Sequence, residues 1–445
     1  MTTINKEQPY PKEPYAWFVV GVLFLVTVFS QLDRQLPTLL VDPIRAEFNI
    51  SDTSFSFIQG YAFAIVYTLA GLPLGRMVDQ TNRRNLIIFG LLFWTGMTIF
   101  SGLADSYTEL FIGRMGVGIG EAVLAPAAYS IISDYMRPER RGRALAVYYV
   151  SIAIGSGASL LIGSIVFHIV PESGMVMPGF GNLEAWRWTF LIAGAPGILI
   201  AALLFTIKEP VRRLQKGYEA KREQVSVQDV LVYLKSNAAT FSRLLLYPSV
   251  LAIIGYGSLA WAPTLFQRKF EMPVSNSGVI LGFLIAIGGA TGTLFSGWLS
   301  DRWYKKGQQS ARFRVTLVGQ LLMLISVWCW PLMPSSLLAF VFLGIAITGL
   351  AIAQSAAPVA IQEVTPNRMR GQVIAIYLLL GGLLGIGLGP TLVALVTDNV
   401  FKNDLSLPYS IAVTAAPSVL FGLWLCWSGL RPYAQTQSEL HKSEE

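Results

Sequence analysis

The sequence has little charge and few cysteines or histidines. Asp, Glu, Lys and Arg together make up 13% of its 445 residues, about half the share typical of a soluble domain. Two cysteines exclude a disulfide scaffold, and two histidines leave little from which to build a metal site or a catalytic centre. No Walker-type Gly-Lys loop occurs, which argues against ATP-driven chemistry. We therefore expect no enzyme, no cofactor and no metal site.

What the sequence has in excess is apolar surface, with 53% hydrophobic residues. A helix needs about 20 predominantly apolar residues to cross a bilayer, and the apolar runs divide into twelve such helices. The predicted fold class is therefore an all-α membrane protein. The expected spans are 15–40, 54–74, 85–104, 108–133, 143–169, 186–207, 243–267, 276–299, 312–332, 336–361, 371–397 and 409–430.

The cations lie between the apolar runs. A net charge of +7 can suggest nucleic-acid binding, but here Lys and Arg separate apolar segments, which is typical of membrane topology. If the N-terminus is cytoplasmic, the inner segments hold 26 Lys and Arg and the outer segments hold 5. This asymmetry predicts a multi-pass membrane protein with both termini in the cytoplasm and no nucleic-acid partner; in a bacterium its membrane would be the inner (plasma) membrane.

Two pairs of similar segments indicate an internal repeat. GRMVDQTNRR, which begins at Gly75, resembles GWLSDRWYKK, which begins 222 residues later. RRGRALAVY, from Arg140, resembles MRGQVIAIY, 229 residues on. Matching loops at matching places predict two six-helix bundles of the same orientation, arranged as a parallel repeat.

The expected organisation follows from these boundaries: a cytoplasmic tail (1–14), an N-terminal bundle (15–207), a cytoplasmic linker (208–242), a C-terminal bundle (243–430) and a cytoplasmic tail (431–445). Within the linker, VSVQDVLVYLKSN is loosely amphipathic. It is interpreted either as a helix on the membrane surface or as a plain linker.

Four charged residues lie inside predicted spans: Asp33 and Arg34 in the first, Arg114 and Glu121 in the fourth. Charge at membrane depth is costly and marks a functional site by default. Arg114 and Glu121, seven residues apart, share one helix face. The alternative is structural, with a static pair at Asp33-Arg34 and a permanently neutralised Glu121. The functional interpretation is a carboxylate balanced between burial, which favours its neutral form, and a nearby arginine, which favours its charged form.

With these motifs in place, the whole chain resembles the secondary transporters of the major facilitator superfamily, since GRMVDQTNRR is similar to that superfamily's signature after helix 2. Within it, Asp33-Arg34 and RMGVGIGEA (114–122) resemble the spinster family of lipid transporters. Ser30 and Gln31 differ from the Asn-Tyr that this family often has before its Asp-Arg pair.

The resemblance implies a proton-coupled secondary active transporter that moves a lipid-like amphipathic solute, of lysolipid or sphingoid type, by alternating access. Its partners would be that solute, protons and the lipid bilayer, and it would act as a monomer. The expected proton-coupling residues are Asp33, Glu121, Arg34 and Arg114. The expected gating residues are Gly75, Asp79, Arg83, Arg84, Arg141 and Asp301. The expected substrate-binding residues are Arg34, Glu121, Tyr256, Trp261 and Gln354.

Other functions stay open at this point. A proton-coupled symporter of small organic anions would bind a carboxylate at Arg34 or Arg114. An uncoupled facilitator would not depend on Asp33 or Glu121. A sensor or scaffold that does not transport is the third alternative, because fold does not fix function.

Overall fold

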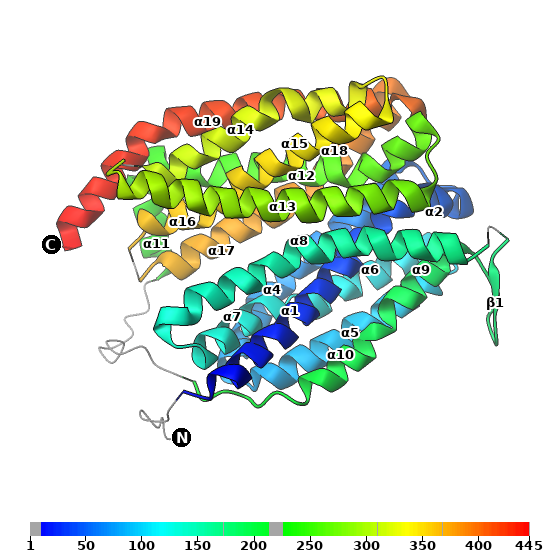
Figure 1. The fold of residues 1–445 in the computed structure, drawn as a ribbon, viewed down its shortest axis with the longest axis horizontal. Coiled ribbons are helices and arrows are strands. Elements are labelled where there is room, and N and C mark those ends of the chain that lie inside the picture. The colour runs from blue at the N-terminus through cyan, green and yellow to red at the C-terminus, as the bar shows by residue number, and fades with distance from the viewer. Residues whose placement is uncertain (1–9, 172, 213–225, 309, 367, 445) are drawn as a thin grey trace. The chain divides into compact units, whose positions relative to one another are not determined.

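The computed structural model describes residues 10–171, 173–212, 226–308, 310–366 and 368–444. In these residues, twelve helical spans are long and apolar enough to cross a membrane, which confirms the predicted all-α, twelve-helix fold (Figure 1). They are Glu13–Leu39, Asp52–Gly71, Arg83–Gly102, Tyr107–Tyr135, Glu139–Ile169, Ala185–Leu204, Ala238–Phe270, Val274–Lys305, Ala311–Leu332, Ser336–Glu363, Arg370–Phe401 and Asp404–Leu440.

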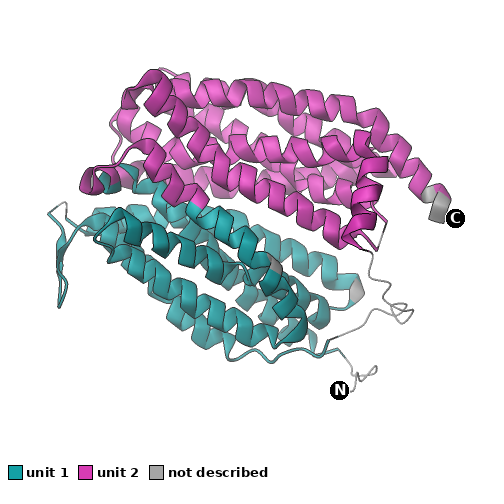
Figure 2. Cartoon of the chain, turned by 180° about the vertical axis from the view of Figure 1, so that it is seen from behind, with its two compact units in different colours: residues 1–44, 62–224 teal, residues 45–61, 225–445 magenta. Residues whose placement is uncertain are grey.

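The chain forms two compact units, coloured separately in Figure 2. Unit 1 comprises residues 1–44 and 62–224, and unit 2 comprises residues 45–61 and 225–445. Residues 45–61 belong by sequence to the expected N-terminal bundle (15–207), yet they pack with unit 2. The contacts that hold this segment there join residues more than 200 positions apart, which no local sequence pattern reveals.

Unit 1 is built from helices and one short hairpin. Its elements are α1 (Glu13–Gln35), η1 (Leu36–Leu39), the start of α2 (Val41–Phe48), α4 (Ala62–Gln80), α5 (Arg83–Gly102), α6 (Tyr107–Glu121), α7 (Leu124–Tyr135), α8 (Pro138–Ile169), β1 (Met175–Met177), β2 (Gly181–Leu183), α9 (Ala185–Gly194) and α10 (Pro196–Leu204). The two strands pair antiparallel. The hydroxyl of Ser106 accepts a hydrogen bond from the Glu109 amide and so caps α6.

Glycine lets α6 approach its neighbours in unit 1. A Cβ at Gly118 would lie 2.8 Å from the carbonyl oxygen of Phe63 in α4. A Cβ at Gly120 would lie 2.8 Å from the carbonyl oxygen of Gly90 in α5. Helices of membrane proteins pack through such small residues, and here they bring the helix that carries Arg114 and Glu121 against its neighbours.

Unit 2 contains the remaining helices. They are α3 (Asp52–Ser56), η2 (Phe57–Tyr61), α11 (Val227–Ser236), α12 (Ala238–Phe270), α13 (Val274–Lys305), α14 (Ala311–Cys329), η3 (Trp330–Leu332), α15 (Ser336–Ser355), α16 (Ala357–Glu363), α17 (Arg370–Leu380), η4 (Gly381–Leu388), α18 (Gly389–Leu395), η5 (Val396–Phe401), η6 (Asp404–Ser406) and α19 (Leu407–Glu444). The segments η2, η4 and η5 are π-helical turns within longer helices.

The amphipathic piece of the expected linker forms the helix α11. Ser226 and Asp229 make a capping box at its start. Val230 is buried in the core of unit 2, and the Tyr233 hydroxyl donates a hydrogen bond to the Val364 carbonyl at 2.8 Å. This segment is therefore a helix packed on unit 2, whereas residues 213–225 of the same linker lie outside the described residues.

The C-terminal helix is longer than expected. The span was predicted to end at residue 430, but α19 continues to Glu444, through most of the expected tail. Tyr433 is fully buried, stacks on Phe313 with ring centroids 5.3 Å apart, and donates a hydrogen bond to Glu363 at 2.7 Å. These contacts hold a segment whose composition alone looks like a solvated tail.

Candidate functional site

The intramembrane charges gather inside unit 1, where α1 meets α6. Arg34 Nε donates to Glu121 Oε2 at 2.6 Å, and the Ser30 hydroxyl donates to the same oxygen at 2.8 Å. The Glu121 side chain is fully buried, while that of Arg34 is 19% exposed. Of this pair, the arginine is therefore the member that can still be reached.

Asp33 and Arg114 lie in the same cluster with unused hydrogen-bonding capacity. Arg114 Nη2 donates to the carbonyl oxygen of Asp33 at 3.1 Å. Among the described residues, neither carboxylate oxygen of Asp33 has a hydrogen-bond partner, nor do Arg114 Nε and Nη1 or Glu121 Oε1. Buried polar atoms are normally paired. The cluster therefore has donors and acceptors with which a proton, a water molecule or a ligand group can pair.

The balance of charge in the cluster is simple. Two carboxylates face two guanidinium groups, and all four interact electrostatically. The cluster is neutral when both acids are ionised, and one bound proton leaves it with a charge of +1. The arrangement can therefore couple the gain of a proton to the attraction of an anion.

Aromatic rings surround the accessible arginine. The Arg34 guanidinium carbon lies 4.5 Å from the centre of the Phe63 ring and 4.7 Å from that of Tyr67, both on α4. Such cation–π contacts hold a guanidinium without using its N–H donors. Arg34 is thus held against α4 by two aromatic rings.

A cluster of three further tyrosines reaches this arginine through Tyr148. The Tyr129 ring on α7 is 5.3 Å from Tyr148 and 5.7 Å from Tyr149, both on α8. Tyr148 interacts electrostatically with Arg34 and with Tyr67. Sequence reasoning missed these tyrosines and also Ser30. Ser30 could have been found, because it lies one helical turn before Arg34, whereas nothing in the sequence links Tyr129 to α1.

The expected substrate residues of unit 2 have different surroundings. Trp261 is fully buried, and its indole N–H donates to the Pro390 carbonyl at 2.9 Å, so in this conformation it packs α12 on α18. Tyr256 is 38% exposed, and Gln354 is half-buried. Tyr256 and Gln354 can thus still meet a ligand, while Trp261 has to leave its packing first.

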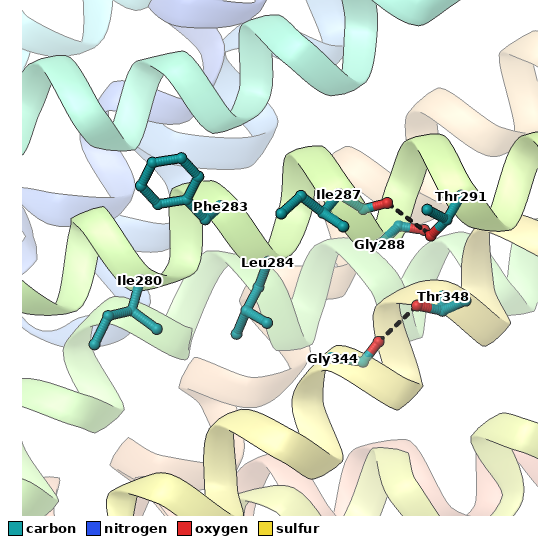
Figure 3. A pocket seen from close by; sticks show the side chains of 8 residues that line it. All are labelled: Ile280, Phe283, Leu284, Ile287, Gly288, Thr291, Gly344 and Thr348. Atoms are coloured by element: carbon teal, nitrogen blue, oxygen red, sulfur yellow. Dashed lines mark hydrogen bonds between the residues drawn. The ribbon is translucent and has the colours of Figure 1, made fainter.

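Unit 2 also contains an apolar hollow of about 390 Å³ between α13 and α15 (Figure 3). It is lined by Ile280, Phe283, Leu284, Ile287, Gly288, Thr291, Gly344 and Thr348. Both threonine hydroxyls donate to carbonyls of their own helices, Thr291 to Ile287 at 2.7 Å and Thr348 to Gly344 at 2.9 Å. The hollow therefore offers hydrocarbon contacts, and the hydroxyl groups of its two threonines already have hydrogen-bond acceptors.

Among the expected gating residues, Arg83 is buried within unit 1. Its guanidinium donates to Asp134 at 2.5 Å, to Ser130 at 2.6 Å, to Glu209 at 2.7 Å and to the Pro210 carbonyl at 3.0 Å. Its neighbour Arg84 donates to the Ile207 carbonyl at 2.9 Å. In this structure both arginines brace α5 against the segment that follows α10.

Unit 2 repeats this brace, with Arg312 and Glu363 at 229 positions after Arg83 and Asp134. Arg312 donates to Asp301 at 3.0 Å and to Glu363 at 3.1 Å. The expected gating residue Asp301 is therefore paired with an arginine of its own unit.

The other expected gating residues make fewer contacts. Asp79 is exposed, and no hydrogen bond or ion pair reaches it from the described part of the chain. A Cβ at Gly75 would meet nothing within 4 Å. Arg141 is half-buried, and its Nε has no partner among the described residues. Within the described residues, Asp79 and the Nε of Arg141 therefore stay unpaired.

Comparison with known proteins identifies the class. The model of the Major Facilitator Superfamily matches residues 23–439. The chain therefore belongs to this superfamily of membrane transporters, as its motifs predicted, and is not an enzyme.

Individual relatives place it more narrowly. An MFS-type efflux pump of Mycolicibacterium smegmatis is 29% identical over 93% of this chain and 92% of its own. A probable L-galactonate transporter of Escherichia coli is 23% identical over 90% and 87%. A solved bacterial homologue of the human lysosomal transporter Spinster, inward-facing and unoccupied, is 25% identical with a TM-score of 0.77, over 97% of this chain and 99% of that chain. The chain is thus similar to a spinster homologue as well as to an efflux pump and a probable sugar-acid transporter.

Proposed function

We propose that this transporter is proton-coupled and moves a lipid-like solute with an anionic head, such as a lysolipid, by alternating access. It would act as a monomer in the inner membrane of a bacterium, with both termini cytoplasmic. One observation carries the proposal: the reachable arginine, Arg34, is held at 2.6 Å by a buried carboxylate, Glu121. A proton on that carboxylate and an anion at that arginine then favour each other.

The coupling follows from competition for Arg34. When Glu121 is ionised, it pairs with the guanidinium of Arg34, and fewer N–H donors remain for an anionic head group. When Glu121 is protonated, the ion pair weakens and the guanidinium donors turn to the substrate. Asp33, fully buried with unpartnered oxygens, is the second acceptor for a proton, and Arg114 beside it limits how readily that proton is held. Proton and anion therefore travel together.

Head and tail of the solute have different partners. The hydroxyl of Tyr67, whose ring lies against Arg34, offers a hydrogen bond and suits a phosphate or hydroxyl head. In unit 2, the apolar hollow at α13 and α15 suits a hydrocarbon tail, since each buried methylene contributes about 0.8 kcal/mol. Gly75, Asp79 and Arg141 stay candidates for the cytoplasmic gate.

A second candidate is a proton-coupled symporter of small organic anions. The similarity to a probable L-galactonate transporter favours it, and the same Arg34 would bind a carboxylate. It needs no apolar tail site. An uncoupled facilitator is the third alternative, and it would ignore both buried carboxylates.

The test is uptake into liposomes that contain the purified protein, with the outside made acidic. The probe is lysophosphatidylglycerol, whose phosphodiester keeps one negative charge from mildly acidic to neutral pH. We expect accumulation that follows the proton gradient. Glu121→Gln and Asp33→Asn should lose the response to the gradient. The control Glu139→Gln, at an exposed carboxylate near the start of α8, should keep it.

The outcomes separate the alternatives. Accumulation of galactonate without lysophosphatidylglycerol would replace the lipid proposal with the organic-anion one. Uptake that is indifferent to the gradient and to both substitutions would establish a facilitator.

A further inference from the structure

Two arginines of unit 2 lie where the start of α12 packs against the end of α19. Arg243 on α12 donates through Nε to the Ser428 hydroxyl on α19 at 3.0 Å. Arg431 follows Ser428 by three residues, so the two are neighbours on the surface of α19, and Arg431 is exposed. By the predicted topology, these helix ends lie at the cytoplasmic face of the membrane. Neither arginine belongs to the expected coupling, gating or substrate residues.

Neutral groups hold Arg243 in place. Besides its bond to Ser428, its Nη1 donates to the Ala239 carbonyl at 2.6 Å. A Cβ at Gly429 would lie 3.2 Å from its Cδ, so α19 approaches the stem of this half-buried side chain closely. Within the part of the chain that the structure describes, no carboxylate pairs with Arg243 or with Arg431. Two positive charges are therefore available to an anion.

The acids around this end of unit 2 have other surroundings. The first acid beyond Arg431 on α19 is Glu439, eight residues on and thus roughly 12 Å further along the helix. Glu439 interacts electrostatically with Tyr233 of α11. The carboxylate of Glu363 accepts a hydrogen bond from Arg312 at 3.1 Å. These acids therefore do not supply the missing anion.

Exposed aromatic side chains continue the same face of α19 toward the middle of the membrane. Trp427, one turn before Arg431, is 72% exposed. Trp424, a turn earlier, is 53% exposed and stacks on Phe421 with ring centroids 5.7 Å apart. All of these residues belong to the apolar span Asp404–Leu440, and tryptophan is typical of the level of the lipid head groups. The face therefore changes from cationic to apolar where a phospholipid changes from head to chains.

We infer that Arg243, Arg431 and Trp427, which we name the α12–α19 site, bind an anionic phospholipid of the inner leaflet, such as phosphatidylglycerol. The two arginines contact its phosphate, and Trp427 and Trp424 pack against its chains. Basic sites between membrane helices on the cytoplasmic side suit anionic head groups, and the adjoining apolar surface favours a lipid over free phosphate. The inference goes beyond the proposed function, because this lipid is a bound partner of unit 2 and not the transported solute.

The test is a competition between two lipids for the purified protein in detergent. Dioleoylphosphatidylglycerol and dioleoylphosphatidylcholine have the same chains and differ in net charge. Native mass spectrometry gives the ratio of the two among complexes with one bound lipid, when both are added in equal amounts. We expect a ratio well above one for the wild type. Arg243→Gln and Arg431→Gln should each lower it on the order of fivefold, and the double variant should bring it close to one.

A matched control lies on α13. Arg302 is exposed, and its guanidinium carbon lies 5.3 Å from the centre of the Trp298 ring, which is itself exposed. Arg302→Gln thus removes the same charge beside a similar tryptophan on a different helix, and it should leave the ratio unchanged. Arg34→Gln, in the charge cluster of unit 1, should also leave the ratio unchanged, which separates this lipid from a solute at Arg34.

The exposed position of Arg431 keeps the test valid if Arg243→Gln does not fold. The inference is overturned if the wild type binds both lipids equally, or if folded, monodisperse Arg431→Gln keeps the wild-type ratio. An equal loss in Arg302→Gln would also refute it, because the preference would then belong to the cations of this face in general. Glycerol 3-phosphate, which has the charge but no chains, should not displace the bound lipid; if it does, the site takes free phosphate instead.

Discussion

At the scale of single residues, the arginines of unit 1 are of two kinds. The guanidinium of Arg83 is 1% exposed and donates to two carboxylates, a hydroxyl and a carbonyl. Arg114 is equally buried but leaves Nε and Nη1 without partners in the described residues. An arginine whose N–H donors are all paired stabilises one structure. An arginine with unpaired donors, beside a carboxylate whose oxygens lack partners, is suited to changing partners during a transport cycle.

This contrast gives a stability prediction. Arg83→Gln strands Asp134 and Glu209 without their cation and should lower the free energy of unfolding by about 3–5 kcal/mol. Arg84→Gln, at a half-buried position one residue on where the side chain donates to the Ile207 carbonyl, should cost only about 1 kcal/mol. Thermal unfolding in detergent, followed by circular dichroism, compares the two variants. Equal midpoints would show that the buried network does not brace unit 1.

The charged members of the cluster could be predicted from the sequence, because charge inside an apolar run is conspicuous. The pairing of Arg34 with Glu121 could not be predicted, since 87 residues separate them. From the sequence, Arg34 could equally have paired with Asp33, and Glu121 with Arg114. Trp261 shows the opposite limit: an aromatic residue inside a span looks the same in sequence whether it faces a ligand or, as here, packs against Pro390.

At the scale of elements, the helix α13 presents apolar side chains away from the core of unit 2. Ile287, which lines the hollow, is 60% exposed. Leu294, seven residues on and therefore on the same face, is 68% exposed and does not line the hollow. These two positions differ chiefly in whether a hydrocarbon tail would meet them.

They make a matched pair for testing the tail site. Ile287→Trp should fill the hollow and weaken binding of lysophosphatidylglycerol, whereas Leu294→Trp should not. In the wild type, a tail four methylenes shorter should lose about 3 kcal/mol, on the order of a hundredfold in affinity. Binding assays in detergent check both. If the affinity depends neither on tail length nor on Ile287→Trp, the hollow is not a site for the tail.

Hydropathy predicts spans well but not what lies at their ends. Twelve apolar runs gave twelve helices, because no other structure than a helix satisfies the backbone of such a run in lipid. The end of α19 and the helix α11 were not determined by composition, since their order depends on contacts made by Tyr433 and Val230 with distant residues. The packing of residues 45–61 on unit 2 could not be predicted for the same reason, because Arg268 lies 216 residues from its partner Asp52.

At the scale of the whole molecule, the sequence repeat corresponds to a repeated structure. Arg83 with Asp134 and Arg312 with Glu363 brace equivalent places in the two units. The intramembrane charge is not repeated: the cluster around Arg34 and Glu121 lies in unit 1, while the apolar hollow lies in unit 2. The two units therefore share a fold but differ in the chemistry that each offers to a solute.

We propose that Glu121 and the substrate compete for Arg34. The affinity for lysophosphatidylglycerol as a function of pH tests this most directly. The probe's charge is constant over the range, so any pH dependence belongs to the protein. If one linked proton is taken up on binding, affinity should rise up to about tenfold for each unit of falling pH.

Glutamine stands in for a permanently protonated Glu121. In Glu121→Gln the affinity should therefore stay at its acidic value at every pH, with folding and tail dependence intact. A variant that keeps the wild-type pH dependence would show that the proton binds elsewhere, and would contradict the claim that Glu121 and the substrate compete for Arg34.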